Sequence, residues 1–188
     1  DRLDYLIFCL KREGIYIYMD QLSHRTFKEG DGPDNMTALP EAGRPYSIFD
    51  KRLIELQKKF SHDLWTHVNP YTKLAYKDDP VVVLAGIANE NDLFARPRNF
   101  IEPYLSRFDG MYREWAKENG VAVGNEKTNF EKLTEPIQHF LHDVQKKYYR
   151  EMSDYLRSIG VRIPLTGTNW SAGTLQQAWA AADLDYAD

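Results

Sequence analysis

This 188-residue chain has almost no cysteine, and its single Cys9 has no partner with which to form an intramolecular disulfide. Long apolar runs are also missing, because the longest, residues 81–88, is far shorter than the ~20 residues that cross a bilayer. Basic residues are not in excess, since 24 Lys and Arg stand against 28 Asp and Glu. We therefore expect no disulfide framework, no membrane-spanning helix, and no nucleic-acid partner bound by bulk charge.

Phosphate-binding and metal-binding motifs are absent as well. Neither G-x-G-x-x-G nor G-x-x-x-x-G-K-[ST] occurs, and residues 30–35 lack the spacing of an EF-hand. His139 and His142 are three residues apart but have no carboxylate at the offset that a metal site needs. The sequence therefore predicts no cofactor and no metal. A hydrophobic fraction of 43% is nevertheless enough for a packed core.

Hydrophobic spacing predicts helices that alternate with strands. The expected strands are residues 15–19, 81–88, 161–166 and the beginning of a fourth at 184–187, and the first is expected to be buried on both faces. The expected helices are residues 3–14, about 50–69, 100–118, 135–160 and 174–182. Residues 21–46 are rich in Gly, Pro, Asp and Asn and predict a long loop, of a length that is commonly functional.

Alternating strands and helices predict an α/β fold with a parallel sheet. A (β/α)8 TIM barrel is favoured over a doubly wound fold because no glycine-rich nucleotide loop follows any strand. Such a barrel needs about 250 residues. We therefore expect residues 1–188 to form a partial catalytic domain, truncated at both ends, with the remainder of the barrel supplied by chain segments outside this sequence.

Polar side chains follow each predicted strand, where the reactive residues of barrels lie. Asp20 and His24 follow the first strand, Asn89 and Glu90 the second, and Asn169 with Trp170 the third. Neutral hydrogen-bonding groups beside an indole ring suit a hydroxyl-rich ligand such as a sugar. Trp170 is a candidate stacking platform, with a core or interface tryptophan as the alternative. His24 and Asp20 are candidate subsite residues.

Glu90 is the sharpest candidate because it directly follows the most apolar strand. A carboxyl group at that place is expected to be partly desolvated, as suits a general acid. The alternative is a structural carboxylate that caps the next helix or pairs with Arg96 or Arg98.

Three segments resemble the cellulase-like retaining glycoside hydrolases of the (β/α)8-barrel clan. These are Ile87-Ala88-Asn89-Glu90-Asn91, the approach from Asn69-Pro70-Tyr71-Thr72 to Asp78-Asp79-Pro80, and Pro164-Leu165-Thr166-Gly167-Thr168-Asn169-Trp170. In that clan the fourth strand ends in Asn-Glu. The resemblance therefore makes residues 15–19 strand three, residues 161–166 strand five, and residue 184 onward the start of strand six.

The resemblance implies roles for two of these residues. Glu90 matches the acid/base that protonates the glycosidic oxygen, and Asn89 matches the amide that hydrogen-bonds the sugar 2-hydroxyl. The family's nucleophile is a glutamate at the end of strand seven, which would lie outside this chain. The implied function is a retaining β-glycosidase, similar to an endo-β-glucanase or cellulase, that cleaves β-linked oligo- or polysaccharide by double displacement.

Three alternatives stay open. The specificity could be of the β-mannanase or β-galactosidase type, or the barrel could bind carbohydrate without catalysis. The chain could also be an unrelated α/β protein in which Glu90 is structural. A polysaccharide substrate implies a secreted or periplasmic protein, although no signal peptide is visible.

Overall fold

The computed structural model describes residues 1–23, 25–169 and 174–186 of the chain. The α-helices are α1 (Arg2–Arg12), α2 (Lys51–Thr66), α3 (Tyr104–Glu118), α4 (Glu135–Ser158) and α5 (Leu175–Ala180). The strands are β1 (Ile17–Asp20), β2 (Val82–Ala88) and β3 (Leu165–Thr168). Short 3-10 helices occupy Glu29–Asp31, Met36–Ala38, Glu41–Gly43, Tyr46–Ile48 and Tyr76–Asp78.

The three described strands form one parallel sheet in the order β1-β2-β3. Consecutive strands are neighbours, and helices α2, then α3 and α4, connect them. The predicted α/β class is confirmed. A (β/α)8 barrel has this sequential order, whereas a doubly wound sheet reverses its order at one point. The described sheet is therefore consistent with a section of a barrel, and the division of residues 1–188 into one partial domain stays a prediction.

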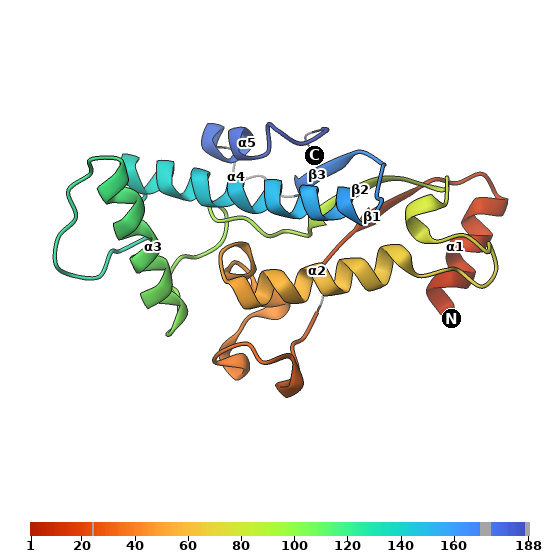
Figure 1. Ribbon diagram of the computed structural model, residues 1–188, viewed down its shortest axis with the longest axis horizontal. Coiled ribbons are helices and arrows are strands. Elements are labelled where there is room, and N and C mark those ends of the chain that lie inside the picture. The colour runs from red at the N-terminus through yellow and green to blue at the C-terminus, as the bar shows by residue number, and fades with distance from the viewer. Residues whose placement is uncertain (24, 170–173, 187–188) are drawn as a thin grey trace.

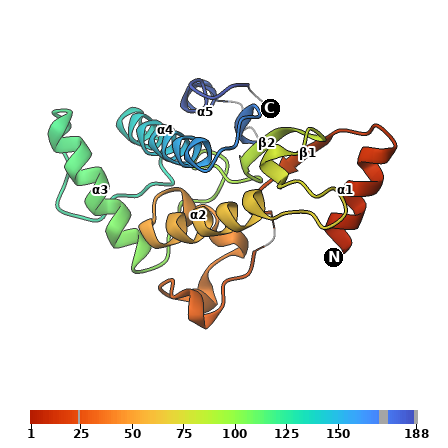
Figure 2. The same ribbon diagram turned by 45° about the vertical axis from the view of Figure 1, so that its right-hand side comes forward.

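Helices α2 and α4 lie side by side on one side of the sheet, with α1 and α3 at opposite ends of the molecule (Figures 1 and 2). Asp50 begins α2, because its carboxylate accepts a hydrogen bond of 3.2 Å from the Leu53 N–H. The apolar faces of both helices bury Leu53, Trp65 and Tyr148, among others, against the sheet.

An aromatic cluster closes the end of the core where α3 meets α4. Phe108 is fully buried at its centre, with ring centroids at 4.4 to 5.0 Å from its nearest aromatic neighbours. These neighbours are Phe49, Phe100, Phe130 and Phe140. Aromatic pairs at such distances contribute about 0.5 to 1.5 kcal/mol each beyond their buried area. The cluster fixes α3 and α4 relative to the loop that enters α2.

Two strands begin later than the sequence predicts, because the first residue of each predicted strand is hydrogen-bonded to the end of the preceding helix. The Ile15 N–H bonds back to the Leu10 carbonyl, so the strand expected at 15–19 begins at Ile17. The Val161 N–H likewise bonds to Leu156, and Pro164 has no N–H, so the strand expected at 161–166 becomes Leu165–Thr168.

Two further expectations about strands were wrong for the described residues. The first strand is not buried on both faces, because Tyr16 and Tyr18 are 70% and 37% exposed. Residues 184–186 are not a strand. This segment nevertheless lies beside β3, because the Asp185 N–H donates to the Leu165 carbonyl at 3.1 Å. The last two residues of the strand expected at 184–187 lie outside the described residues.

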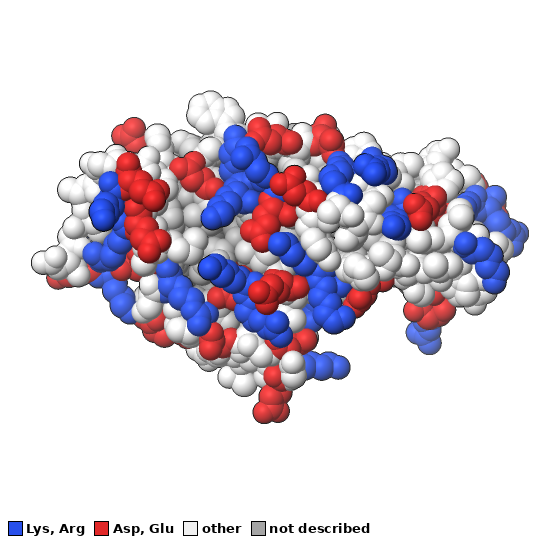
Figure 3. All heavy atoms as spheres, viewed as in Figure 1, with Lys and Arg blue, Asp and Glu red and all other residues white. Residues whose placement is uncertain are grey.

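Charged side chains of both signs are interspersed over the face shown in Figure 3, without an extended area of one sign. This distribution agrees with the slightly negative net charge. Among the described residues, no helix combines the length and the apolar character that crossing a membrane requires.

The buried Asp79 provides a test of how α1 is held. Its carboxylate accepts hydrogen bonds from the Lys11 ammonium at 2.8 Å and the Val81 N–H at 3.1 Å. Burial opposes its charge, but these donors outweigh burial and hold the pKa of Asp79 below its usual value. The resulting stabilisation is present above about pH 4 and is lost as the pH falls through the lowered pKa.

We predict that Asp79→Asn lowers the free energy of unfolding by about 2 kcal/mol at pH 7, and by less near pH 2.5. Urea unfolding at both pH values measures this difference. The control is Asp63→Asn, which removes the exposed pair with Lys59 and should cost under about 0.5 kcal/mol. Equal stability of Asp79→Asn and the unmodified protein at pH 7 would contradict the prediction.

Candidate functional site

Three consecutive strands deliver polar residues to one edge of the sheet. Asp20 ends β1, Asn89 and Glu90 directly follow β2, and Asn169 directly follows β3. Because the strands are parallel and adjacent, their carboxyl ends lie together. The structure therefore brings together four of the six residues that the sequence singles out. His24 and Trp170 lie outside the described residues.

The side-chain amide of Asn169 joins the three strand ends. Its Oδ1 accepts a hydrogen bond of 2.8 Å from the Glu90 N–H. Its Nδ2 donates to Asn89 Oδ1 at 2.8 Å and to Asp20 Oδ2 at 3.1 Å. Only a side chain with an acceptor and a two-proton donor can make all three bonds at once. Asn169 thereby fixes the backbone at Glu90 and the orientation of the Asn89 amide.

Glu90 has an unusual backbone conformation. Its φ is +45°, in the left-handed region that costs a residue with a Cβ about 1 to 2 kcal/mol. The Arg96 guanidinium supports this turn, since Nε and Nη2 donate to the Glu90 carbonyl at 2.9 and 2.7 Å. The bonds from Arg96 and Asn169 hold the two peptide groups on either side of the Glu90 Cα.

The Glu90 carboxylate faces two guanidinium groups. Its Oε2 is 3.6 Å from Arg96 Nη2 and 4.0 Å from Arg44 Nη1. The Glu90 side chain is 55% exposed, so about half of its surface is shielded from solvent. Arg96 is thus the partner that the structural alternative predicted, whereas the Arg98 guanidinium donates to backbone carbonyls.

Arg44 is a site residue that the sequence reading missed. It is 8% exposed, donates from Nη2 to the Ser23 carbonyl, and comes from the long loop before α2. With Arg96 it lines a hollow of about 340 Å³, whose wall also includes Tyr46 and Asn99. The only signal in the sequence was the length of the loop, because no local spacing relates Arg44 to Glu90.

A buried glutamine next to Asp20 stabilises the strand ends. Gln21 follows Asp20, is 1% exposed, and donates from Nε2 to the Gly86 carbonyl at 3.0 Å. Its Oε1 accepts from Ser61 Oγ at 2.8 Å and from Trp65 Nε1 at 3.2 Å. These bonds attach the end of β1 to β2 and to helix α2. A buried amide with all these partners makes the strand ends rigid.

A second buried group fixes the chain after Glu90. Asp92 Oδ1 accepts from the backbone N–H groups of Phe94 and Ala95, and Oδ2 accepts from Gln145 Nε2 at 2.5 Å. The Gln145 amide also accepts from the Leu93 N–H at 2.8 Å. Burial raises the pKa of Asp92 in spite of these donors. Helix α4 therefore positions the turn that carries Glu90.

Two strand glycines allow tyrosine side chains to approach the sheet closely. A Cβ on Gly86 would lie 2.4 Å from the Tyr18 hydroxyl, and a Cβ on Gly167 would lie 2.5 Å from the Tyr149 ring. Both distances are far below van der Waals contact, so larger residues at these positions would displace the rings.

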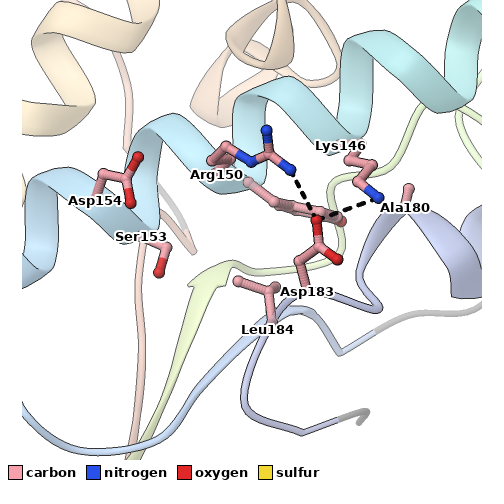
Figure 4. Close-up of a pocket in the computed structure, with 8 residues that line it drawn as sticks. Lys146, Arg150, Ser153, Asp154, Ala180, Asp183 and Leu184 are labelled. Atoms are coloured by element: carbon pink, nitrogen blue, oxygen red, sulfur yellow. Dashed lines mark hydrogen bonds and ion pairs between the residues drawn. The ribbon is translucent and has the colours of Figure 1, made fainter.

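A hollow of about 460 Å³ lies away from the strand ends, between α4 and the segment after α5 (Figure 4). Asp183 accepts from Arg150 at 3.0 Å and lies 3.2 Å from Lys146 Nζ, and these bonds hold the pKa of Asp183 below its usual value. The Asp183 carboxylate pairs with both cations and so connects the segment after α5 to α4. This hollow is therefore a weaker candidate site.

Comparison with known proteins finds similarity in structure but not in sequence. No family model matches the sequence, and no curated protein matches it. The chain is similar in structure to the endo-beta-1,4-mannanase from Thermotoga petrophila, with a TM-score of 0.39 and 18% identity. The similarity covers 91% of this chain and 46% of that protein, so the chain spans about half its length. A similarity of this degree says nothing about the reaction.

The conformation of Glu90 gives a prediction that does not depend on function. Glycine adopts positive φ without strain, so Glu90→Gly should be about 1 kcal/mol more stable than Glu90→Ala. Urea unfolding of the two variants measures the difference. A Glu90→Ala variant as stable as Glu90→Gly would show that the turn relaxes and is not held by Asn169 and Arg96.

Proposed function

We propose that the chain carries the acid/base half of a retaining β-glycosidase that hydrolyses β-linked polysaccharide. Glu90 is the acid/base, Asn89 binds the sugar 2-hydroxyl, and Asn169 is a positioning residue. The observation that carries this proposal is the Asn169 amide, which holds Asn89 and the Glu90 backbone side by side at the strand ends.

In the first step the Glu90 carboxyl gives its proton to the glycosidic oxygen as the bond to the anomeric carbon breaks. A second carboxylate, about 5 to 5.5 Å from the first, attacks that carbon and forms a glycosyl ester. In the second step the Glu90 carboxylate takes a proton from water, whose oxygen replaces the ester. We place this second carboxylate outside these 188 residues, as the family resemblance implies.

The orientation of Asn89 suits its proposed role. Its Oδ1 accepts from Asn169, which leaves Nδ2 without a hydrogen-bond partner among the described residues. Asn89 is only half-buried, so this N–H2 group is available to a ligand. A donor held in this way can strengthen its bond to the 2-hydroxyl as positive charge develops on the sugar ring.

The magnitudes argue against a purely structural Glu90. A half-exposed ion pair with N···O distances of 3.6 and 4.0 Å contributes at most about 1 kcal/mol. The left-handed backbone costs about as much or more. The ion pairs therefore do not account for a glutamate at this position, whereas a catalytic role does.

The runner-up is carbohydrate binding without hydrolysis, and the arginine contacts favour it. A carboxylate that faces Arg44 and Arg96 is a suitable hydrogen-bond acceptor for sugar hydroxyls. Cellulase-like, β-mannanase-type and β-galactosidase-type specificities all fit the described residues. A polysaccharide substrate favours a secreted or periplasmic protein.

Glu90→Gln separates these functions in the full-length protein. We predict that turnover of β-linked substrates with poor leaving groups falls by about 10² to 10⁴, because the amide has no proton to transfer. Stability should change by less than about 1 kcal/mol. Steady-state kinetics on soluble β-glucan and β-mannan, with urea unfolding alongside, measures both.

The matched control for this experiment is Glu55→Gln, which removes another exposed Glu–Arg pair, with Arg52 at 3.4 Å. Its turnover should equal that of the unmodified protein. Full turnover by Glu90→Gln would exclude Glu90 as the acid/base. Absence of hydrolysis in the unmodified protein, together with retained oligosaccharide binding, would favour the binding function.

A further inference from the structure

A hollow of about 320 Å³ lies where α3, α4 and α5 meet, and two tryptophans line it. Trp115 belongs to α3 and Trp179 to α5. Polar side chains complete the lining, and these are Asn119, His139, His142, Asp143 and Gln176. None of these residues belongs to the strand ends that carry the candidate catalytic site.

One wall of this hollow is rigid. The Trp115 indole Nε1 donates to Asp143 Oδ2 at 2.8 Å, and the other Asp143 oxygen is 2.9 Å from His142 Nδ1. The indole ring also stacks beside Tyr112, with 6.1 Å between centroids and 17° between planes, and contacts Phe140 at 5.9 Å. Trp115 is therefore held in position before any ligand binds.

The other wall presents a tryptophan to solvent. Trp179 is 59% exposed and contacts no other aromatic ring among the described residues. Single exposed apolar side chains are common and by themselves indicate nothing. Trp179 differs because it lines the same hollow as the fixed indole of Trp115.

The polar groups between the tryptophans have unused hydrogen-bonding capacity. The His139 imidazole and the Gln176 amide have no hydrogen-bond partner within the described parts of the chain, and both line the hollow. Asn119 uses its Nδ2 to donate to the Trp115 carbonyl at 2.8 Å, so its Oδ1 remains available as an acceptor. The hollow thus combines amide and imidazole groups and the Asp143 carboxylate with apolar ring surfaces.

This chemistry selects one class of ligand. An anion would require Lys or Arg in the lining, and none is present there. A metal ion would require a cluster of ligating side chains, and the described residues contain no group of three His, Cys, Asp or Glu that could hold one. A neutral sugar matches, because its hydroxyls pair with amide and imidazole groups and its C–H faces contact indole rings.

We propose that Trp115 and Trp179 form a second carbohydrate-binding site, which takes a neutral hexose unit of an oligo- or polysaccharide. The site is separate from Asn89 and Glu90, and it does not depend on the proposed catalytic function. A polymer held at this surface is kept at high local concentration near the strand ends.

The experiment is affinity electrophoresis of the full-length protein in native gels that contain soluble galactomannan or mixed-linkage β-glucan. All variants carry Glu90→Gln, so that the polymer is not degraded. We expect Trp179→Ala to weaken polymer binding by about tenfold or more, and Gln176→Ala to weaken it less. The matched control is Leu175→Ala, an exposed residue of the same helix that does not line the hollow.

Equal retardation of Trp179→Ala and the parent would overturn the proposal, as would equal losses in Trp179→Ala and Leu175→Ala. A change of sedimentation coefficient in Trp179→Ala would also overturn it, because the hollow would then be a contact between protein copies. Failure of the catalytic proposal is recognised separately, since Glu90→Gln would keep full turnover of a short aryl glycoside while polymer retardation still required Trp179.

Discussion

The candidate site depends on one side-chain amide. Asn169 accepts from the backbone of Glu90 and donates to Asn89 and Asp20, and so it fixes three neighbouring strand ends with a single group. A parallel sheet brings these ends near one another, but it does not fix their side chains. The Asn169 amide fixes these side chains, and so an exposed edge of the sheet can hold a defined geometry.

Buried polar groups below the edge make that geometry rigid. Gln21 ties β1 to β2 and α2, and Gln145 ties Asp92 to helix α4. At the edge itself, the Arg96 guanidinium binds the Glu90 carbonyl, and the Glu90 side chain remains half-exposed. The arrangement places rigidity in the buried layer and leaves the Glu90 carboxylate accessible, which is what a catalytic or binding group requires.

The sequence predicted the parts of the fold that local patterns encode. The apolar run at 81–88 became β2, which begins one residue later and ends at the same residue. Asp20, Asn89, Glu90 and Asn169 lie together at one edge of the sheet. Helix ends took the first residues of the other strands, because their N–H groups bond back to helix carbonyls. Arg44 and the left-handed Glu90 were not predictable, since both depend on long-range contacts. The function assigned to these residues remains a proposal.

The most direct test of the central claim is azide rescue of Glu90→Ala in the full-length protein, with an activated aryl β-glycoside as substrate. If Glu90 is the acid/base, its removal leaves the glycosyl ester without a base to activate water. Azide needs no base, so it should raise turnover and give a glycosyl azide of retained β configuration. Unchanged turnover with azide, or a product without azide, would contradict the assignment of Glu90.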